Sequence, residues 1–179
     1  LSVYHIGYMI GPRINAGGRV GKSSHGANLL MDNNAKNVYE IAIELDHSNK
    51  ERQHLEKEVL DLVLSELGDS VLDPVIIINR KNLHEGVIGI VASRIKDKFN
   101  KPVIIISLDD KIGKASARSI VGFDIGSVII SAVQEKILIK GGGHKMAGGF
   151  TIKIENVEKF KTFILKKFEK SSINHTSLK

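Results

Sequence analysis

Residues 35–67 constrain this chain most, because they form a long helical pattern that is apolar at both ends and polar in the middle. Apolar side chains recur at helical spacing from Val38 to Leu45 and again from Leu55 to Val63. The segment between them, DHSNKERQH at 46–54, has no apolar residue. Such a helix would be about 50 Å long, and a helix that is polar all round its middle bridges two bodies across solvent. We therefore expect the chain before it to end one domain and the chain after it to begin another.

The composition is that of a globular chain of one domain plus an attached piece. With 179 residues, 42% hydrophobic and 26% charged, the disordered and collagen-like classes are excluded, and no apolar run approaches the roughly 18 residues that cross a bilayer. The absence of cysteine excludes a disulfide framework, a thiolate zinc site and a cysteine nucleophile. The chain begins with Leu1 and carries no secretory pattern. We expect a piece of a longer cytoplasmic protein without a membrane partner.

Residues 1–22 are rich in glycine and contain Pro12, which predicts a short strand running into a glycine loop. A short helix should follow up to Asp32, with Ser23 or Ser24 as its N-cap.

The segment AGGRVGKS at 16–23 fits a relaxed phosphate-binding-loop pattern. A nucleotide hydrolase would need a buried strand directly before it and a parallel strand soon after, whereas the next strand pattern begins at residue 74, so we disfavour that interpretation. The alternative is a loop whose Arg13, Asn15 and Arg19 reach a phosphodiester, since guanidinium forks match phosphate geometry.

After Gly68, which should end the long helix, strands and helices alternate. The runs 74–79 and 102–107 are continuous and β-branched, as in strands covered on both faces, and the amphipathic segment 86–99 between them fits a crossover helix. Further strands are predicted at 112–120 and 148–154, and further helices from the Asp124 cap to Val133 and at 157–168, before a frayed tail at 171–179. The fold class is therefore α/β, a mixed β-sheet flanked by helices and preceded by the long inter-domain helix.

The positive charge is concentrated at the C-terminal end. Residues 1–134 hold 16 basic and 16 acidic side chains, whereas residues 135–179 hold 10 Lys and 4 Glu, which accounts for the net charge of +6. A local basic field attracts an anionic backbone such as that of nucleic acid. The alternative is a solvated, lysine-rich surface helix.

The segment from Lys140 to Lys145 is a candidate phosphate site. Gly141, Gly142 and Gly143 let backbone amides approach a ligand closely, and His144 adds a donor. The alternative is a flexible turn with a surface histidine.

Two further candidates lie earlier in the chain. In an extended strand Ser116 and Arg118 share one polar face with Lys114, although an ordinary edge strand gives the same pattern. His84 precedes the crossover helix, where it is placed either beside a bound anion or as a cap alone. Asp46 and His47 are adjacent, but no convergent set of Asp and His ligands for two-metal hydrolysis is evident. The chain therefore reads as a binding surface without a reaction centre.

Five motifs together resemble the RecJ family of single-strand-specific 5′ to 3′ exonucleases, within the DHH phosphoesterase superfamily. They are, in order, GPRINAGGR (11–19), the long helix, LHEGVIGIVASRI (83–95), ASARSI (115–120) and GGGHKMAGGF (141–150). The resemblance implies that residues 1–33 end the catalytic DHH domain, that 34–70 form the connecting helix and that 71–170 form the DHHA1 substrate-binding domain.

The same resemblance implies roles for residues. Gly141 to Gly143, His144, Ser116 and Arg118 match backbone-contacting positions, and Arg13, Asn15 and Arg19 match a loop along the DNA path. The family binds Mn²⁺ or Mg²⁺ through Asp-rich and DHH motifs, none of which is present here, so no catalytic or metal residue is assigned and the chain alone should be inactive. The implied partners are single-stranded DNA and, less directly, single-strand-binding protein, in DNA repair and recombination. Two alternatives stay open: a related phosphodiesterase acting on short oligonucleotides or cyclic dinucleotides, and a stand-alone nucleic-acid-binding DHHA1 module.

Overall fold

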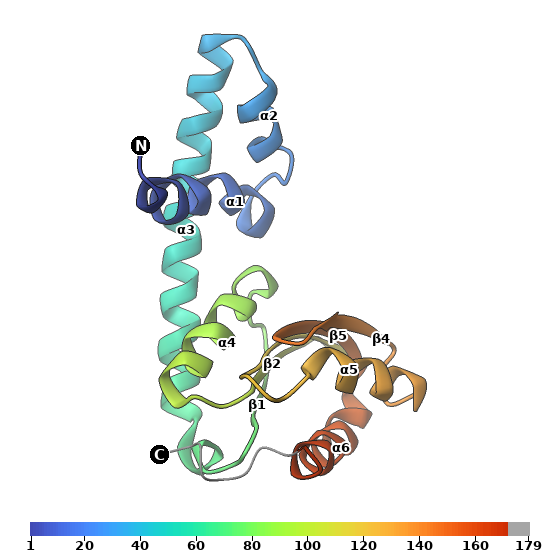
Figure 1. The fold of residues 1–179 in the computed structure, drawn as a ribbon. Helices are drawn as coiled ribbons and strands as arrows, with labels where there is room; N and C mark the ends of the chain where they lie inside the picture. Colours follow the sequence, from blue (N-terminus) through green and yellow to red (C-terminus); the bar gives the residue numbers. More distant parts are fainter. Residues whose placement is uncertain (172–179) are drawn as a thin grey trace. The chain divides into compact units, whose positions relative to one another are not determined.

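The structure, a computed structural model, describes residues 1–171. Apart from Ser171, the tail predicted at 171–179 lies outside the described residues. The chain divides into two compact units, one from Leu1 to Glu58 and one from Val59 onward. Helix α3 (Ala35–Glu66) contributes to both and confirms the predicted long helix (Figure 1). Within the described residues, no helix has both the length and the apolarity needed to cross a bilayer.

The first unit is helical from its start, so the strand and loop predicted at residues 1–22 are wrong. A π-helix, η1 (His5–Ile10), leads into α1 (Gly11–Val20), and α2 (His25–Met31) follows. Pro12 lies in the first turn of α1, directly after the π-helix that leads into it. Ser24 occupies the N-cap position of α2 as predicted, but its side chain makes no capping hydrogen bond.

Gly17 serves close packing between helices rather than a flexible loop. A Cβ atom built on Gly17 would lie 2.7 Å from the carbonyl oxygen of Lys22 and 3.2 Å from Cδ2 of Leu45 on α3. The buried Gly17 therefore lets α1 approach α3 more closely than any larger residue would allow.

The second unit contains a mixed five-stranded sheet in the order β1-β2-β3-β5-β4, which confirms the predicted fold class. β1 pairs with β2 in parallel through the crossover helix α4, and the other neighbours are antiparallel. The elements are β1 (Ile76–Lys81), α4 (Glu85–Phe99), β2 (Val103–Leu108), β3 (Ile112–Arg118), α5 (Ile125–Gln134), β4 (Lys140–His144), β5 (Ala147–Lys153) and α6 (Val157–Glu169), with short 3₁₀ turns η2 (Gly68–Val71) and η3 (Ile154–Asn156).

The prediction that the two β-branched strands are covered on both faces is confirmed for β2 and only partly for β1. Five of the six β2 residues are buried. β1 is an edge strand in which only Ile76 is fully buried. Asp124 caps α5 as predicted, accepting a hydrogen bond from the Ser127 amide at 3.0 Å, and this bond lowers the pKa of the Asp124 carboxyl.

Different helices cover the two faces of the sheet (Figure 1). α5 and α6 pack on one face, where the main core joins residues such as Ile106 and Phe150 to Ile129 and Phe160. The rings of Phe150 and Phe160 lie with centroids 4.7 Å apart. α4 packs on the opposite face, over β2 and β3. The face beside α4, over β3, β5 and β4, carries most of the site residues predicted in this unit.

Candidate nucleic-acid interface

Three cross-strand rows of residues line the sheet face beside α4. Residues paired across antiparallel strands project from the same face, so the register of β3, β5 and β4 fixes which side chains meet. We name the rows by their character: an arginine row (Arg118, Ala147, His144), a glycine row (Ser116, Gly149, Gly142) and a lysine row (Lys114, Thr151, Lys140). The predicted residues Ser116, Arg118, Gly142 and His144 are thus brought together on one surface.

The triple-glycine segment is strand β4, so the predicted loop is wrong in conformation. Gly141 and Gly143 project to the opposite face, toward α5. A Cβ on Gly141 would lie 2.8 Å from Cγ2 of Ile129, and one on Gly126 of α5 would lie 2.9 Å from the carbonyl carbon of Gly143. Gly141 is therefore explained by its contacts with α5 and Phe150, and Gly143 by the β5 backbone at Ala147 and Gly148, whereas Gly142 is the one that faces the rows.

The glycine row forms a floor without bulky side chains. No described atom lies within 4 Å of a Cβ built on Gly142, and one on Gly149 would meet only the carbonyl oxygen of Ala115, at 3.3 Å. An open hollow of about 620 Å³ lies over this part of the sheet, lined by the lysine row, by Ser116 and Gly149 and by Glu85 and Ile88 of α4. The surface can therefore admit a ligand close to the backbone of β4 and β5.

Arg118 is held in a fixed orientation between β3 and α4. Its Nε donates to the hydroxyl of Ser93 at 3.0 Å, and its Nη1 donates to the hydroxyl of Ser116 at 3.1 Å and to the carbonyl oxygen of Ala117 at 2.8 Å. A Cβ on Gly89 of α4 would lie 2.9 Å from Nη2 of Arg118. Gly89 therefore makes room for the guanidinium group against the helix.

The lysine row joins Lys114 and Lys140, which the sequence motifs already contained, to Thr151, which sequence reasoning missed. Lys114 Nζ lies 2.8 Å from Oε2 of Glu85, in a pair whose side chains are 55% and 53% exposed. Lys140 is exposed and Thr151 is half-buried beside it in register. The sequence spacing contained part of this information, because Lys140 precedes Gly142 by two residues and Thr151 follows Gly149 by two. Only the pairing of β4 with β5, however, places Lys140 beside Thr151.

His84 caps α4. Its Nδ1 accepts a hydrogen bond from the Gly86 amide at 3.2 Å, and its own backbone is extended, as at other N-caps. This geometry supports the capping alternative, and an anion beside His84 stays a prediction.

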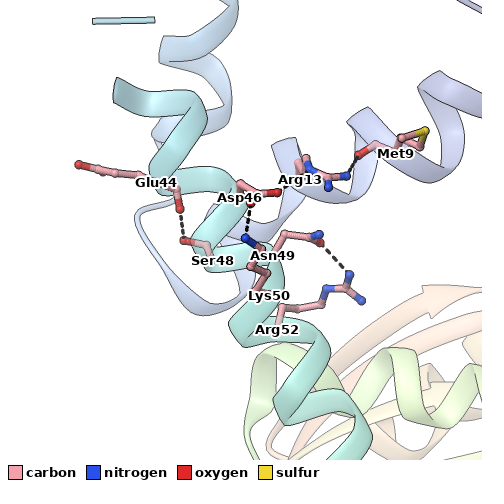
Figure 2. A network of polar contacts seen from close by, with 8 residues as sticks. All are labelled: Met9, Arg13, Glu44, Asp46, Ser48, Asn49, Lys50 and Arg52. Carbon is pink, nitrogen blue, oxygen red and sulfur yellow. Dashed lines mark hydrogen bonds and ion pairs between the residues drawn. The ribbon is translucent and has the colours of Figure 1, made fainter. Parts of the chain in front are cut away.

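The predicted residues of the first unit lie on α1. Arg13 donates from Nε to Asp46 and from Nη1 to the carbonyl oxygen of Met9, both at 2.8 Å, and Lys50 Nζ lies 2.9 Å from the same Asp46 carboxyl (Figure 2). The hydrogen bonds from Lys50 and Arg13 lower the pKa of Asp46. Arg13 thus ties α1 to α3, whereas Asn15 and Arg19 are exposed. Contact of these three with DNA stays a prediction.

The described part of the chain does not fit a catalytic metal. Among residues 1–171, no three His, Asp or Glu side chains converge in a group that could hold an ion. The Mn²⁺ or Mg²⁺ implied by the family resemblance therefore has no binding residues here, and no step of a reaction is assigned to this surface.

Comparison with known proteins agrees with the motifs. Residues 68–170 match the model of the DHHA1 domain. The single-stranded-DNA-specific exonuclease RecJ of Bacillus subtilis is 35% identical over 155 residues, which is 85% of this chain and 20% of that protein. The RecJ of Haemophilus influenzae is 36% identical over 190 residues, covering 87% of this chain and 28% of that protein. The chain thus spans less than a third of the length of either relative.

Solved structures show the same fold. RecJ from Thermus thermophilus in complex with Mg²⁺ matches with a TM-score of 0.82 and 30% identity, over 92% of this chain and 26% of that one. Exonuclease RecJ bound to manganese matches with a TM-score of 0.80 and 30% identity, over 94% of this chain and 42% of that one. The chain belongs to the DHHA1 domain family and is a homologue of the DHHA1-containing region of RecJ exonucleases.

Proposed function

We propose that this chain is the single-stranded-DNA-binding part of a RecJ-type exodeoxyribonuclease that acts from 5′ to 3′ in DNA repair and recombination. The substrate and the activity are those of the relatives, which are single-stranded-DNA-specific exonucleases. The observation that carries the proposal is the surface of three rows, which places Arg118, His144 and two lysines on one face around a glycine floor. In the whole protein, Mn²⁺ or Mg²⁺ and the cutting residues would lie outside the residues described here.

The chemistry of the surface suits a sugar–phosphate backbone. Arg118 presents a guanidinium cation that is already oriented by Ser93 and Ser116, so little side-chain entropy is lost when it binds a phosphate. The one aromatic residue lining the hollow, Phe150, is buried with its ring packed against Phe160 in the core, so the hollow's lining offers no aromatic ring on which a base can stack. Binding should therefore depend on phosphates, tolerate any sequence and weaken steeply with salt.

The test is fluorescence anisotropy of the purified chain with a labelled oligothymidylate, a duplex of the same length and a tRNA. We expect the single strand to bind most tightly. Arg118→Lys, which keeps the charge but loses the fork, should weaken that binding roughly tenfold. Equal binding of the duplex, or an unchanged affinity in Arg118→Lys, would contradict the proposal. Preference for tRNA would support the stand-alone module instead.

A hydrolysis assay tests the second half of the proposal. A 5′-labelled oligonucleotide incubated with the chain and Mn²⁺ should stay intact, because no described residues converge to hold the ion. Metal-dependent degradation of the labelled oligonucleotide by the purified chain would show that the reaction centre lies within the chain.

A further inference from the structure

We propose that the lysine row is a second phosphate contact, separate from Arg118, so that the surface holds two phosphates of one strand on either side of the glycine floor. This inference rests on the proposed function, since it concerns how the same surface grips a single strand. It joins Lys114 and Lys140, which lie in two separate sequence motifs, with Thr151 into one contact that no single motif indicates.

The spacing of the rows sets which phosphates can be held. Lys114 and Arg118 lie four positions apart on β3, and Lys140 and His144 lie four positions apart on β4. At about 3.3 Å per residue, the backbone positions of the lysine row and the arginine row lie about 13 Å apart. Consecutive phosphates of one strand are joined through a single sugar, which is too short for this distance. Contacts made directly over the two rows would therefore use phosphates at least two nucleotides apart, with the intervening sugars over Gly142 and Gly149.

The residues of the lysine row project from one face of the sheet. Thr151 lies in register between Lys114 on one neighbouring strand and Lys140 on the other, so the two lysines stand on either side of it in the row. An anion seated over Thr151 would therefore have a cationic side chain on each side. Each ammonium carries three donors, so the pair with Glu85 leaves Lys114 able to donate to a phosphate as well.

A structural explanation exists for each lysine taken alone. Lysine is common on edge strands, where it discourages pairing with another chain, and this would explain Lys140 on the edge strand β4. Lys114 lies on β3, which is paired on both sides, and it has Glu85 of α4 as its ion-pair partner. Neither explanation requires the two lysines to share one row beside the hollow, whereas a shared anionic ligand does.

Glu85 gives the site an internal counter-charge. Its carboxylate lines the same hollow and pairs with Lys114. An arriving phosphate meets this negative charge as well as the ammonium group. Replacing Glu85 with glutamine should therefore tighten binding of long oligonucleotides by about two- to fivefold, the range expected for an exposed charge pair.

The experiment compares affinity across a ladder of oligothymidylates from two to eight nucleotides, at one low salt concentration. In the unmodified chain, affinity should rise about tenfold once the ligand can place two phosphates about 13 Å apart. The variant Lys114→Gln/Lys140→Gln should lose that rise and keep the affinity for the shortest ligands. The matched control Lys159→Gln/Lys166→Gln removes the same charge from α6, on the opposite face of the sheet, and should retain the rise.

Salt dependence of octamer binding provides a second measurement. Loss of one phosphate contact should reduce the slope of log affinity against log salt by about 0.7 in the lysine-row variant and not in the control. Equal slopes for both variants, an equal loss of affinity at every ligand length, or weaker binding by Glu85→Gln would overturn the second contact while leaving the proposed function in place. No binding of any oligonucleotide by the folded, unmodified chain would overturn both.

Discussion

The Nε of Arg118 on β3 donates a hydrogen bond to the hydroxyl of Ser93 on α4, 3.0 Å away. This bond joins the sheet to the helix that covers it and fixes the plane of the guanidinium group. It is possible because Gly89, one turn before Ser93, has no side chain: a Cβ there would lie 2.8 Å from the hydroxyl of Ser116 and 2.9 Å from Nη2 of Arg118.

We therefore predict that Gly89→Ala disturbs binding more than folding. The added methyl group meets only the ends of two side chains, which can move aside, and alanine favours the helix by up to about 1 kcal/mol. The displaced Arg118 should bind single-stranded DNA about three- to tenfold more weakly. Anisotropy and urea unfolding of the same sample check this prediction, which fails if affinity is retained or if the free energy of unfolding falls by several kcal/mol.

Alanine substitutions at the adjacent residues Gly142 and Gly143 of β4 should differ in their effect on the free energy of unfolding. Gly143→Ala places a methyl group against the carbonyl oxygen of Ala147 and the Cα of Gly148, both backbone atoms that cannot rotate away. We expect it to lower the free energy of unfolding by about 1–3 kcal/mol. Gly142→Ala projects into open space and should leave stability unchanged while weakening oligonucleotide binding. Equal destabilisation by both substitutions, measured by urea unfolding, would show that Gly142 is also a packing residue.

Much of the fold was predictable because its signals are local. The long helix α3, the crossover helix α4 and the strand β2 follow from apolar spacing and β-branched runs within single segments. The glycine-rich segments were mispredicted for one shared reason. Composition shows that glycine is present but not whether it serves a turn or a close contact, and at Gly17 and Gly141 the contacts are with distant residues, Leu45 and Ile129.

The candidate site was predictable only in part, for a related reason. Period two within β3 already places Ser116 and Arg118 on one face. Thr151 and Lys140 belong to the lysine row only because β5 pairs with both β3 and β4, and no single segment specifies that pairing. Arg13 is a case in which a contact was not predicted, because no local pattern relates it to Asp46, 33 residues away.

The Arg13–Asp46 pair predicts a pH dependence of the first unit. Hydrogen bonds from Lys50 and Arg13 hold the pKa of Asp46 below its ordinary value of 3.8. The stabilisation is therefore fully present above that pH and is lost as the pH falls through the lower folded-state pKa. Asp46→Asn should be less stable than the unmodified chain at pH 7, and the difference should shrink below about pH 4. Thermal melts of both proteins from about pH 2.5 to about pH 7, a range that spans the ordinary pKa of an Asp carboxyl, check this, and a pH-independent difference would contradict it.

The last prediction concerns why Gly148, opposite Gly143 in β5, must be glycine. A Cβ on Gly148 would lie 2.5 Å from Cδ1 of Ile129, a fully buried side chain of α5, and 3.0 Å from the carbonyl oxygen of Gly142. Gly148→Ala alone should cost about 1–3 kcal/mol through overpacking, and Ile129→Val alone about 0.5–1.5 kcal/mol through the lost methyl group.

In the double variant Ile129→Val/Gly148→Ala, the atom that the new methyl group meets is gone. The two losses should therefore not add, and a double-mutant cycle by urea unfolding should give a favourable coupling of about 0.5–3 kcal/mol. The pair Ile129→Val/Gly142→Ala is the control, since Gly142 faces the other side of the sheet and should combine additively with the change at Ile129. Additive losses in the first pair would mean that the backbone contact with Gly142, rather than the approach of α5, excludes a side chain at Gly148.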